Sequence, residues 1–160
     1  MAWSSTDIEG LLVGQPIIYR MHPRAQQLFD TLALAPHPEG GWYRQVFKSE
    51  ERVTRHADDA QRSALSTIYF LLVEGTSSAW HRVRSDEAWH FYEGEPLELL
   101  TREHEHDAPS IARLDAGHRV HVVRAREWQA ARPLGAYTLV GCTVGPGFDF
   151  ADFEMIAGPI

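Results

Sequence analysis

The sequence predicts an all-β fold, a barrel or a sandwich, preceded by one helix. Short runs of β-forming residues, separated by Gly, Pro and Asp turns, follow one another from residue 42 onward at the spacing typical of such folds. Only one segment shows the period of an amphipathic helix. The chain of 160 residues is long enough for one domain with a sizeable core, which needs no disulfide or metal to hold it together.

The predicted helix begins at Pro23, because proline suits the first helical position, and it ends before Pro36. Apolar residues recur along it at i, i+3, i+4 and i+7, namely Ala25, Leu28, Phe29 and Leu32. Residues 1–21 show no strong period and contain two glycines and a proline. We therefore expect an N-terminal extension over residues 1–21 and a single domain over residues 22–160.

Ten strands are expected after the helix, each bounded by turn residues. Their ranges are 42–48, 65–73, 77–83, 87–92, 97–101, 111–114, 119–123, 128–131, 137–144 and 153–156. Two stretches between them, 52–62 and 102–109, are polar and highly charged, and we expect them to be exposed connections.

Composition excludes several classes of protein. The chain has 15 Lys and Arg against 22 Asp and Glu, a net charge of −7, which argues against a nucleic-acid partner. Its longest apolar run, residues 68–73, is far shorter than the roughly 20 residues of a membrane-spanning helix, so no membrane partner is expected. Asp7 and Glu9 near the start, with no basic residue before Arg20, are unlike a signal peptide. The single cysteine, Cys142, excludes a disulfide framework. We expect a cytoplasmic location.

The most informative segment runs from Gly75 to Gly94, with His81, Val83 and Glu87 between these glycines. Side chains two residues apart on a strand point the same way, so positions 81 and 83 are expected to face the barrel interior together. Glu87 comes from the following strand. Its carboxylate is expected to approach His81 inside the barrel.

This spacing resembles the first signature of the cupin superfamily, Gly-x5-His-x-His-x3,4-Glu-x6-Gly, with Val83 in place of the second histidine. The second signature, Gly-x5-Pro-x-Gly-x2-His-x3-Asn, is best matched by VVRAREWQAAR at residues 122–132. There Arg124 and Arg126 stand in place of the Pro and Gly, and Gln129 stands in place of the last histidine ligand.

Two further segments narrow the resemblance. PHPEGGWYR at residues 36–44 and GCTVGPGFDFADFE at residues 141–154, together with SDEAWHFYEG, resemble the small cupins of domain-of-unknown-function family 985, also called cupin family 5. The resemblance implies a double-stranded β-helix, or jelly-roll, barrel with an internal pocket, and a homodimer. It implies no particular reaction, so function has to be argued from the site.

His81 and Glu87 are the candidate catalytic residues, because buried titratable pairs in a concave site are how acid and base catalysts are built. The alternative is a hydrogen-bonded pair that only stabilises the barrel. Either Tyr69 or Tyr92 is a further candidate proton donor. The candidate ligand-binding residues are His37, Glu39, Trp42, Tyr69, Trp89 and Gln129.

The candidate metal ligands are His81, Glu87 and Gln129. A catalytic metal normally has about three good protein ligands, and Val83 and Gln129 remove two of the usual imidazoles. We therefore expect no resident cofactor. His104 and His106 lie in a charged connection and are expected to be solvated.

Three hypotheses for function follow. The first is a cupin that binds a small polar, possibly sugar-like, molecule and catalyses metal-independent acid/base chemistry such as epimerisation or isomerisation. The second is a metal-dependent cupin oxygenase or lyase. The third is a module that binds a small molecule, or senses it, without turning it over.

Overall fold

A computed structural model describes residues 21–160, so the extension expected over residues 1–21 lies, apart from Met21, outside the described residues. Its helix α2 spans Pro23–Thr31, close to the predicted range. The His22 side chain caps this helix by accepting a hydrogen bond from the Arg24 N–H at 3.2 Å. None of the helices among residues 21–160 has the length and apolarity to span a membrane.

All ten predicted strands are present, with ends displaced by at most two residues. Three short strands, β1, β3 and β4, come in addition. The strands are β1 Ala35–Pro36, β2 Trp42–Lys48, β3 Arg52–Thr54, β4 Gln61–Ser63, β5 Ser66–Val73, β6 Ser78–Arg82, β7 Asp86–Gly94, β8 Leu97–Arg102, β9 Ser110–Leu114, β10 Val120–Val123, β11 Trp128–Pro133, β12 Tyr137–Gly145 and β13 Glu154–Met155.

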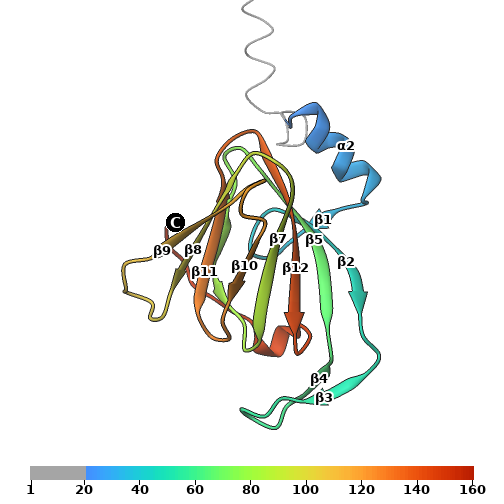
Figure 1. Ribbon diagram of the computed structural model, residues 1–160, viewed down its shortest axis with the longest axis vertical. Helices are drawn as coiled ribbons and strands as arrows, with labels where there is room; N and C mark the ends of the chain where they lie inside the picture. Colours follow the sequence, from blue (N-terminus) through green and yellow to red (C-terminus); the bar gives the residue numbers. More distant parts are fainter. Residues whose placement is uncertain (1–20) are drawn as a thin grey trace, which may run out of the picture.

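The strands form two main antiparallel sheets that close into a barrel (Figure 1). One sheet has the order β1-β2-β5-β12-β7-β10, and the other has the order β13-β6-β11-β8-β9. Inward-facing side chains from both sheets form the core, among them Phe70, Trp89, Leu99 and Val140, each at most 1% exposed. Burying each large apolar side chain of this kind contributes about 1.5–3 kcal/mol.

Helix α2 covers the outer face of the first sheet at one end of the barrel (Figure 1). Strand β5 alternates there: Phe70 points into the core, whereas Leu71 points outward onto the helix. Ala25 and Leu28 supply the buried stripe of the helix. The helix therefore lies beside the end of the barrel opposite the small β3–β4 hairpin (Figure 1).

The hairpin β3–β4 corrects the expectation that residues 52–62 are simply an exposed connection. Arg55 in this hairpin is 6% exposed, and its Nη1 donates to Asp152 Oδ2 at 2.7 Å. Arg62 Nε donates to the same carboxylate at 2.8 Å. Asp152 ends the 3-10 helix η2, Phe150–Asp152, so Arg55 and Arg62 fasten the hairpin to η2, while most of residues 52–62 are exposed as expected. The second charged connection, residues 102–109, is exposed over 103–109, as expected.

Candidate functional site

A pocket of about 90 Å³ opens at the end of the barrel that carries η2, the lower end in Figure 1. Polar or ionisable side chains line part of it, and apolar side chains line the rest. The polar group comprises His37, Glu39, Tyr43, Gln45, Ser66, His81, Glu87 and Cys142, and the apolar group comprises Ile68, Val83, Val144, Phe148, Phe150 and Phe153. Core side chains fill much of the barrel interior behind this pocket.

Strand alternation explains most of the lining. His81 and Val83 both face the pocket, as their spacing of two predicts. Glu87 is two residues before the fully buried Trp89 on β7, so both point into the barrel, with Glu87 nearer the opening. His90 is three residues from Glu87 and therefore belongs to the outer face.

Glu39 reaches the pocket from the turn between β1 and β2. Gly40 in this turn has φ +104°, and a Cβ at its position would lie 2.4 Å from the Ser77 carbonyl oxygen, so only glycine fits. The Glu39 carbonyl accepts a hydrogen bond from the Ala79 N–H at 2.6 Å, which joins the turn to β6. The PHPEGG segment thus brings a carboxyl group beside His81.

Glu39 and His81 form the central contact of the site. Glu39 Oε2 lies 3.3 Å from His81 Nε2, and the two side chains are only 8% and 3% exposed. His81 Nδ1 lies 2.8 Å from the Ala79 carbonyl oxygen, which can only accept, so Nδ1 carries a proton. In the neutral ring, Nε2 is then the basic atom, and it faces Glu39.

Burial decides where the shared proton lies. Burial lowers the pKa of His81 to about 4, and it raises the pKa of Glu39 well above its usual value, with a smaller contribution from the charge of Glu87. Both shifts favour the neutral forms, in which Glu39 is a carboxylic acid whose O–H faces the unprotonated Nε2 of His81. The contact then joins a neutral acid and a neutral base.

Glu87 belongs to a separate hydrogen-bond chain. Trp89 Nε1 can only donate, and it donates to Gln129 Oε1 at 2.8 Å, so Gln129 Nε2 must be the atom that donates to Glu87 Oε2 at 2.6 Å. Burial raises the pKa of Glu87 to about 7, although the hydrogen bonds from Gln129 and Cys142 oppose this rise. Glu87 therefore changes charge near neutral pH.

Two further groups in the pocket are neutral. Burial lowers the pKa of His37 to about 4, and its Nδ1 accepts a hydrogen bond from the Glu39 N–H at 3.3 Å. Burial also raises the pKa of the Cys142 thiol well above its usual value, and the neighbouring Glu87 raises it further. Cys142 is thus a thiol that donates to Glu87, not a thiolate nucleophile.

Aromatic rings form the mouth of the pocket. The Phe153 ring centroid lies 5.7 Å from that of His81, and Phe148 and Phe150 pack edge-on to each other at 5.0 Å. Phe150 is 60% exposed, so its ring lies at the opening. These rings exclude water from the ionisable groups behind them, which is the physical cause of the shifted pKa values.

The contacts between the predicted site residues differ from those that the sequence pattern suggested. His37, Glu39, His81 and Glu87 all line the pocket. The residue in contact with His81 is Glu39, whereas Glu87 is bonded to Gln129. Sequence reasoning did not select Tyr43, Gln45 or Cys142 for the lining, although the period of two places Tyr43 and Gln45 on the face opposite Trp42.

Four of the predicted ligand-binding residues lie elsewhere. Trp42 and Tyr69 face outward and pack against the cluster beneath α2, because they occupy the outer positions of β2 and β5. Trp89 and Gln129 point inward but are fully buried below the pocket, where each satisfies the other's hydrogen bond. Tyr92 is on the outer face, 46% exposed. These side chains support the pocket from behind or from outside.

The donor set does not fit a resident metal ion. Residues 21–160 contain no group of three or more His, Cys, Asp or Glu side chains arranged to hold one. Gln129 Oε1 is the only atom of that side chain suited to a metal, and it is taken by the Trp89 indole. His81, Glu87 and Gln129 therefore do not form the ligand set considered from the sequence.

Two facing antiparallel sheets with a pocket at one end define a jelly-roll barrel with an internal pocket. Residues 26–156 match the family described as Cupin superfamily (DUF985). The chain belongs to this family, as its motifs indicated.

Solved structures agree with this assignment. A hypothetical protein from Leishmania major is 31% identical, with a TM-score of 0.75 over 82% of this chain and 86% of that one. A protein from Shewanella oneidensis is 33% identical, with a TM-score of 0.73 over 83% of this chain and 84% of its own. L-ribose isomerase from Cellulomonas parahominis shares the fold alone. It is 13% identical, with a TM-score of 0.54 over 67% of this chain and 61% of its own. No curated protein matches the chain.

Proposed function

We propose that the pocket binds a small hydroxy-carbonyl compound of the sugar type and catalyses its epimerisation or isomerisation by proton transfer. The observation that carries this proposal is the buried contact between Glu39 Oε2 and His81 Nε2 at 3.3 Å. A neutral acid held against a neutral base can deliver a proton to a carbonyl oxygen without first separating charge in an apolar site.

Glu87 supplies the second group that such a reaction needs. With a pKa of about 7, Glu87 is ionised in a substantial fraction of molecules at neutral pH. Its carboxylate would take the proton from the carbon next to the carbonyl, while the Glu39 acid gives its proton to the carbonyl oxygen. Glu87 then gives the proton to the neighbouring carbon, the former carbonyl carbon of the enediol, and Glu39 recovers a proton from the hydroxyl group on the carbon that was first deprotonated, which becomes the new carbonyl. No oxidant, reductant or metal enters this cycle.

His81 and Glu87 are both candidate catalytic residues from the sequence, and the proposal gives them different parts. In the proposal, Nε2 of His81 holds the Glu39 proton in place before the reaction and stabilises it on its return. Gln129 keeps the Glu87 carboxylate oriented through its short hydrogen bond.

Exchange of hydrogen for deuterium tests the proposal. Wild-type protein is incubated in D2O with three- to six-carbon aldoses and ketoses, and loss of the proton next to the carbonyl is followed by NMR. We expect exchange that Glu39→Gln and Glu87→Gln each slow by about 100-fold or more. The matched control is Glu105→Gln in the exposed connection, which should exchange like wild type.

Two results would contradict the proposal. One is an absence of exchange above the buffer rate with every compound tested, which would favour a pocket that binds without turnover. The other is wild-type exchange in Glu39→Gln, which would show that the Glu39–His81 contact has no part in proton transfer.

A further inference from the structure

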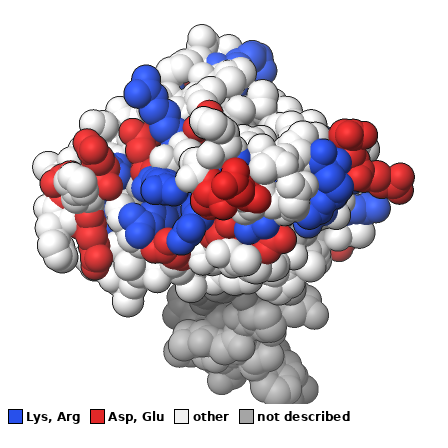
Figure 2. All heavy atoms as spheres, turned by 90° about the horizontal axis from the view of Figure 1, so that it is seen from below, with Lys and Arg blue, Asp and Glu red and all other residues white. Residues whose placement is uncertain are grey.

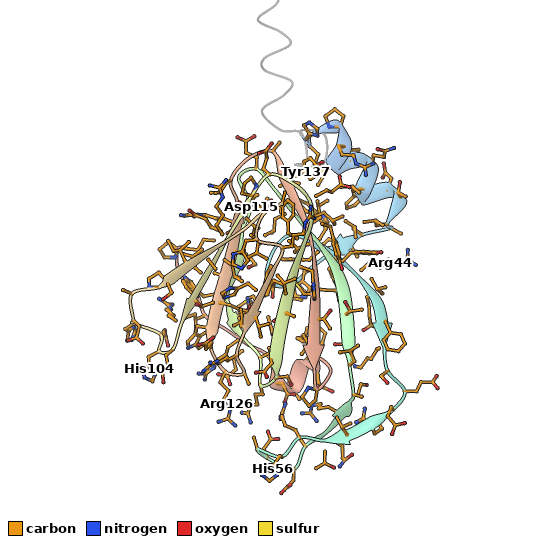
Figure 3. The ribbon with its side chains drawn as sticks, viewed as in Figure 1. Arg44, His56, His104, Asp115, Arg126 and Tyr137 are labelled. Carbon is orange, nitrogen blue, oxygen red and sulfur yellow. The ribbon has the colours of Figure 1, made fainter. Side chains whose placement is uncertain are left out.

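A second hollow, of about 160 Å³, lies beside the pocket. It is lined by Arg82, Val83, Arg84, Arg126 and Glu154. Val83 also lines the barrel pocket, so this side chain stands between the two cavities. Figure 3 places Arg126 at the lower end of the barrel, on the turn between β10 and β11.

Of the three arginines, Arg126 has no side-chain partner among residues 21–160, and Arg84 has only a long ion pair. Arg82 donates to Glu154 Oε2 at 2.6 Å and lies 4.5 Å above the Trp128 ring, so it is already neutralised. Arg84 Nη1 is 3.7 Å from Asp58 Oδ2, too far for a hydrogen bond. That Asp58 carboxylate already accepts two hydrogen bonds from Arg55.

Arg126 is the least engaged of the three. Among residues 21–160, its guanidinium makes no hydrogen bond or ion pair, whereas its backbone N–H donates to the Val83 carbonyl at 2.7 Å. Figure 2, which views the molecule from below, shows basic side chains gathered near the middle of this face beside acidic ones. The chain as a whole carries a net charge of −7, so a hollow lined by three arginines and one glutamate is a local concentration of positive charge.

The backbone of Arg126 adds a second argument. Its φ is 73°, the left-handed conformation that glycine adopts freely and that other residues adopt at a cost. The second cupin signature has glycine at this position. Residues in unfavourable backbone conformations are concentrated at ligand sites. An arginine in this conformation therefore points to a function of its side chain.

We propose that Arg84 and Arg126 bind the phosphate group of a phosphorylated substrate, whose hydroxy-carbonyl part lies in the barrel pocket on the other side of Val83. Guanidinium groups bind phosphate oxygens through paired N–H donors, which gives both charge and geometry. The identity of the rest of the ligand rests on the proposed function, whereas the anion site itself does not.

Titration with inorganic phosphate tests the anion site. The side-chain Nε–H resonances of 15N-labelled arginine are followed by NMR, and we expect saturable shifts for Arg84 and Arg126. Binding should weaken by about tenfold or more in Arg126→Gly and in Arg84→Gln, the loss expected for one charge-assisted contact. Arg119→Gln, an exposed arginine just before β10, is the matched control and should bind like wild type.

Arg126→Gly is informative because glycine takes φ 73° without cost. Its melting temperature should equal or exceed that of wild type, so weaker binding cannot be attributed to unfolding. Shifts that do not saturate, or equal phosphate affinity in wild type and in the Arg84→Gln, Arg126→Gly double variant, would overturn the anion site.

Comparing one compound with and without its phosphate separates this inference from the proposed function. In the deuterium-exchange assay, Arg126→Gly should raise KM for the phosphorylated form about tenfold, leave its kcat within about twofold, and leave the unphosphorylated form unchanged. Equal effects on both forms would refute the phosphate subsite and leave the proposed function standing. Saturable phosphate binding with no exchange of any compound would uphold the anion site and refute the proposed function.

Discussion

Replacing Glu87 by glutamine should remove a large pH-dependent contribution to the stability of the folded protein. Burial raises the pKa of Glu87 from 4.5 to about 7. Between these two pH values, the folded state holds a proton that the unfolded state has released, so protonation stabilises the fold. This stabilisation is complete below about pH 4.5 and is lost as the pH rises through 7.

The magnitude follows from the size of the shift. The rise in the pKa of Glu87 from 4.5 to about 7 corresponds to roughly 3 kcal/mol, most of which is lost between pH 5 and pH 8. His37 and His81 act in the opposite direction, because their lowered pKa values of about 4 destabilise the fold as the pH falls below 6.5. These histidine contributions are common to wild type and variant and cancel when the two are compared.

Urea unfolding followed by tryptophan fluorescence at pH 5 and pH 8 measures this difference. Between pH 5 and pH 8, wild type should lose roughly 2–3 kcal/mol more of its unfolding free energy than Glu87→Gln does. Glu105→Gln in the exposed 102–109 connection should behave as wild type. If Glu87→Gln and wild type show the same pH dependence, then Glu87 does not hold a raised pKa, and the base assigned to the reaction is wrong.

Two further predictions concern the groups that support the site. Gln129→Leu leaves the Trp89 indole N–H and the Glu87 carboxyl without their shared partner. Urea unfolding should therefore show a loss in unfolding free energy of about 1–3 kcal/mol for each of these two groups. An unchanged unfolding free energy would mean that the hydrogen-bond chain does not form. Asp152→Asn removes the charge that pairs with Arg55 and Arg62, whereas Arg55 keeps its hydrogen bonds to Asp58, so the same assay should show a loss of about 1.5–3 kcal/mol. A loss below about 0.5 kcal/mol would mean that the Arg55–Asp152 pair does not form.

The strands were predictable from local pattern. Along β5, apolar residues fill both faces, because one face meets the core and the other meets α2, and turn residues mark both ends. The positions of His81 and Val83 followed from the period of two. Such features depend only on residues near one another in the chain.

The contacts between distant segments were not predictable. Glu39 meets His81 only because the Gly40 turn folds onto β6, and no periodicity reports that approach. Trp42 and Tyr69 are aromatic residues on the correct strands, yet the side of the sheet that each faces depended on where α2 packs. The charges of residues 52–62 suggested solvent, because the sequence does not show that Asp152 lies opposite Arg55.

The protonation state of His81 is the most direct test of the proposed chemistry. In 15N-histidine-labelled protein, NMR shifts report the proton on each ring nitrogen between pH 5 and pH 8. We predict a neutral ring throughout, protonated on Nδ1 and bare on Nε2, with titration only near pH 4. A doubly protonated His81 at pH 6 to 7 would show an imidazolium beside a Glu39 carboxylate, and would contradict the neutral acid and base on which the account depends.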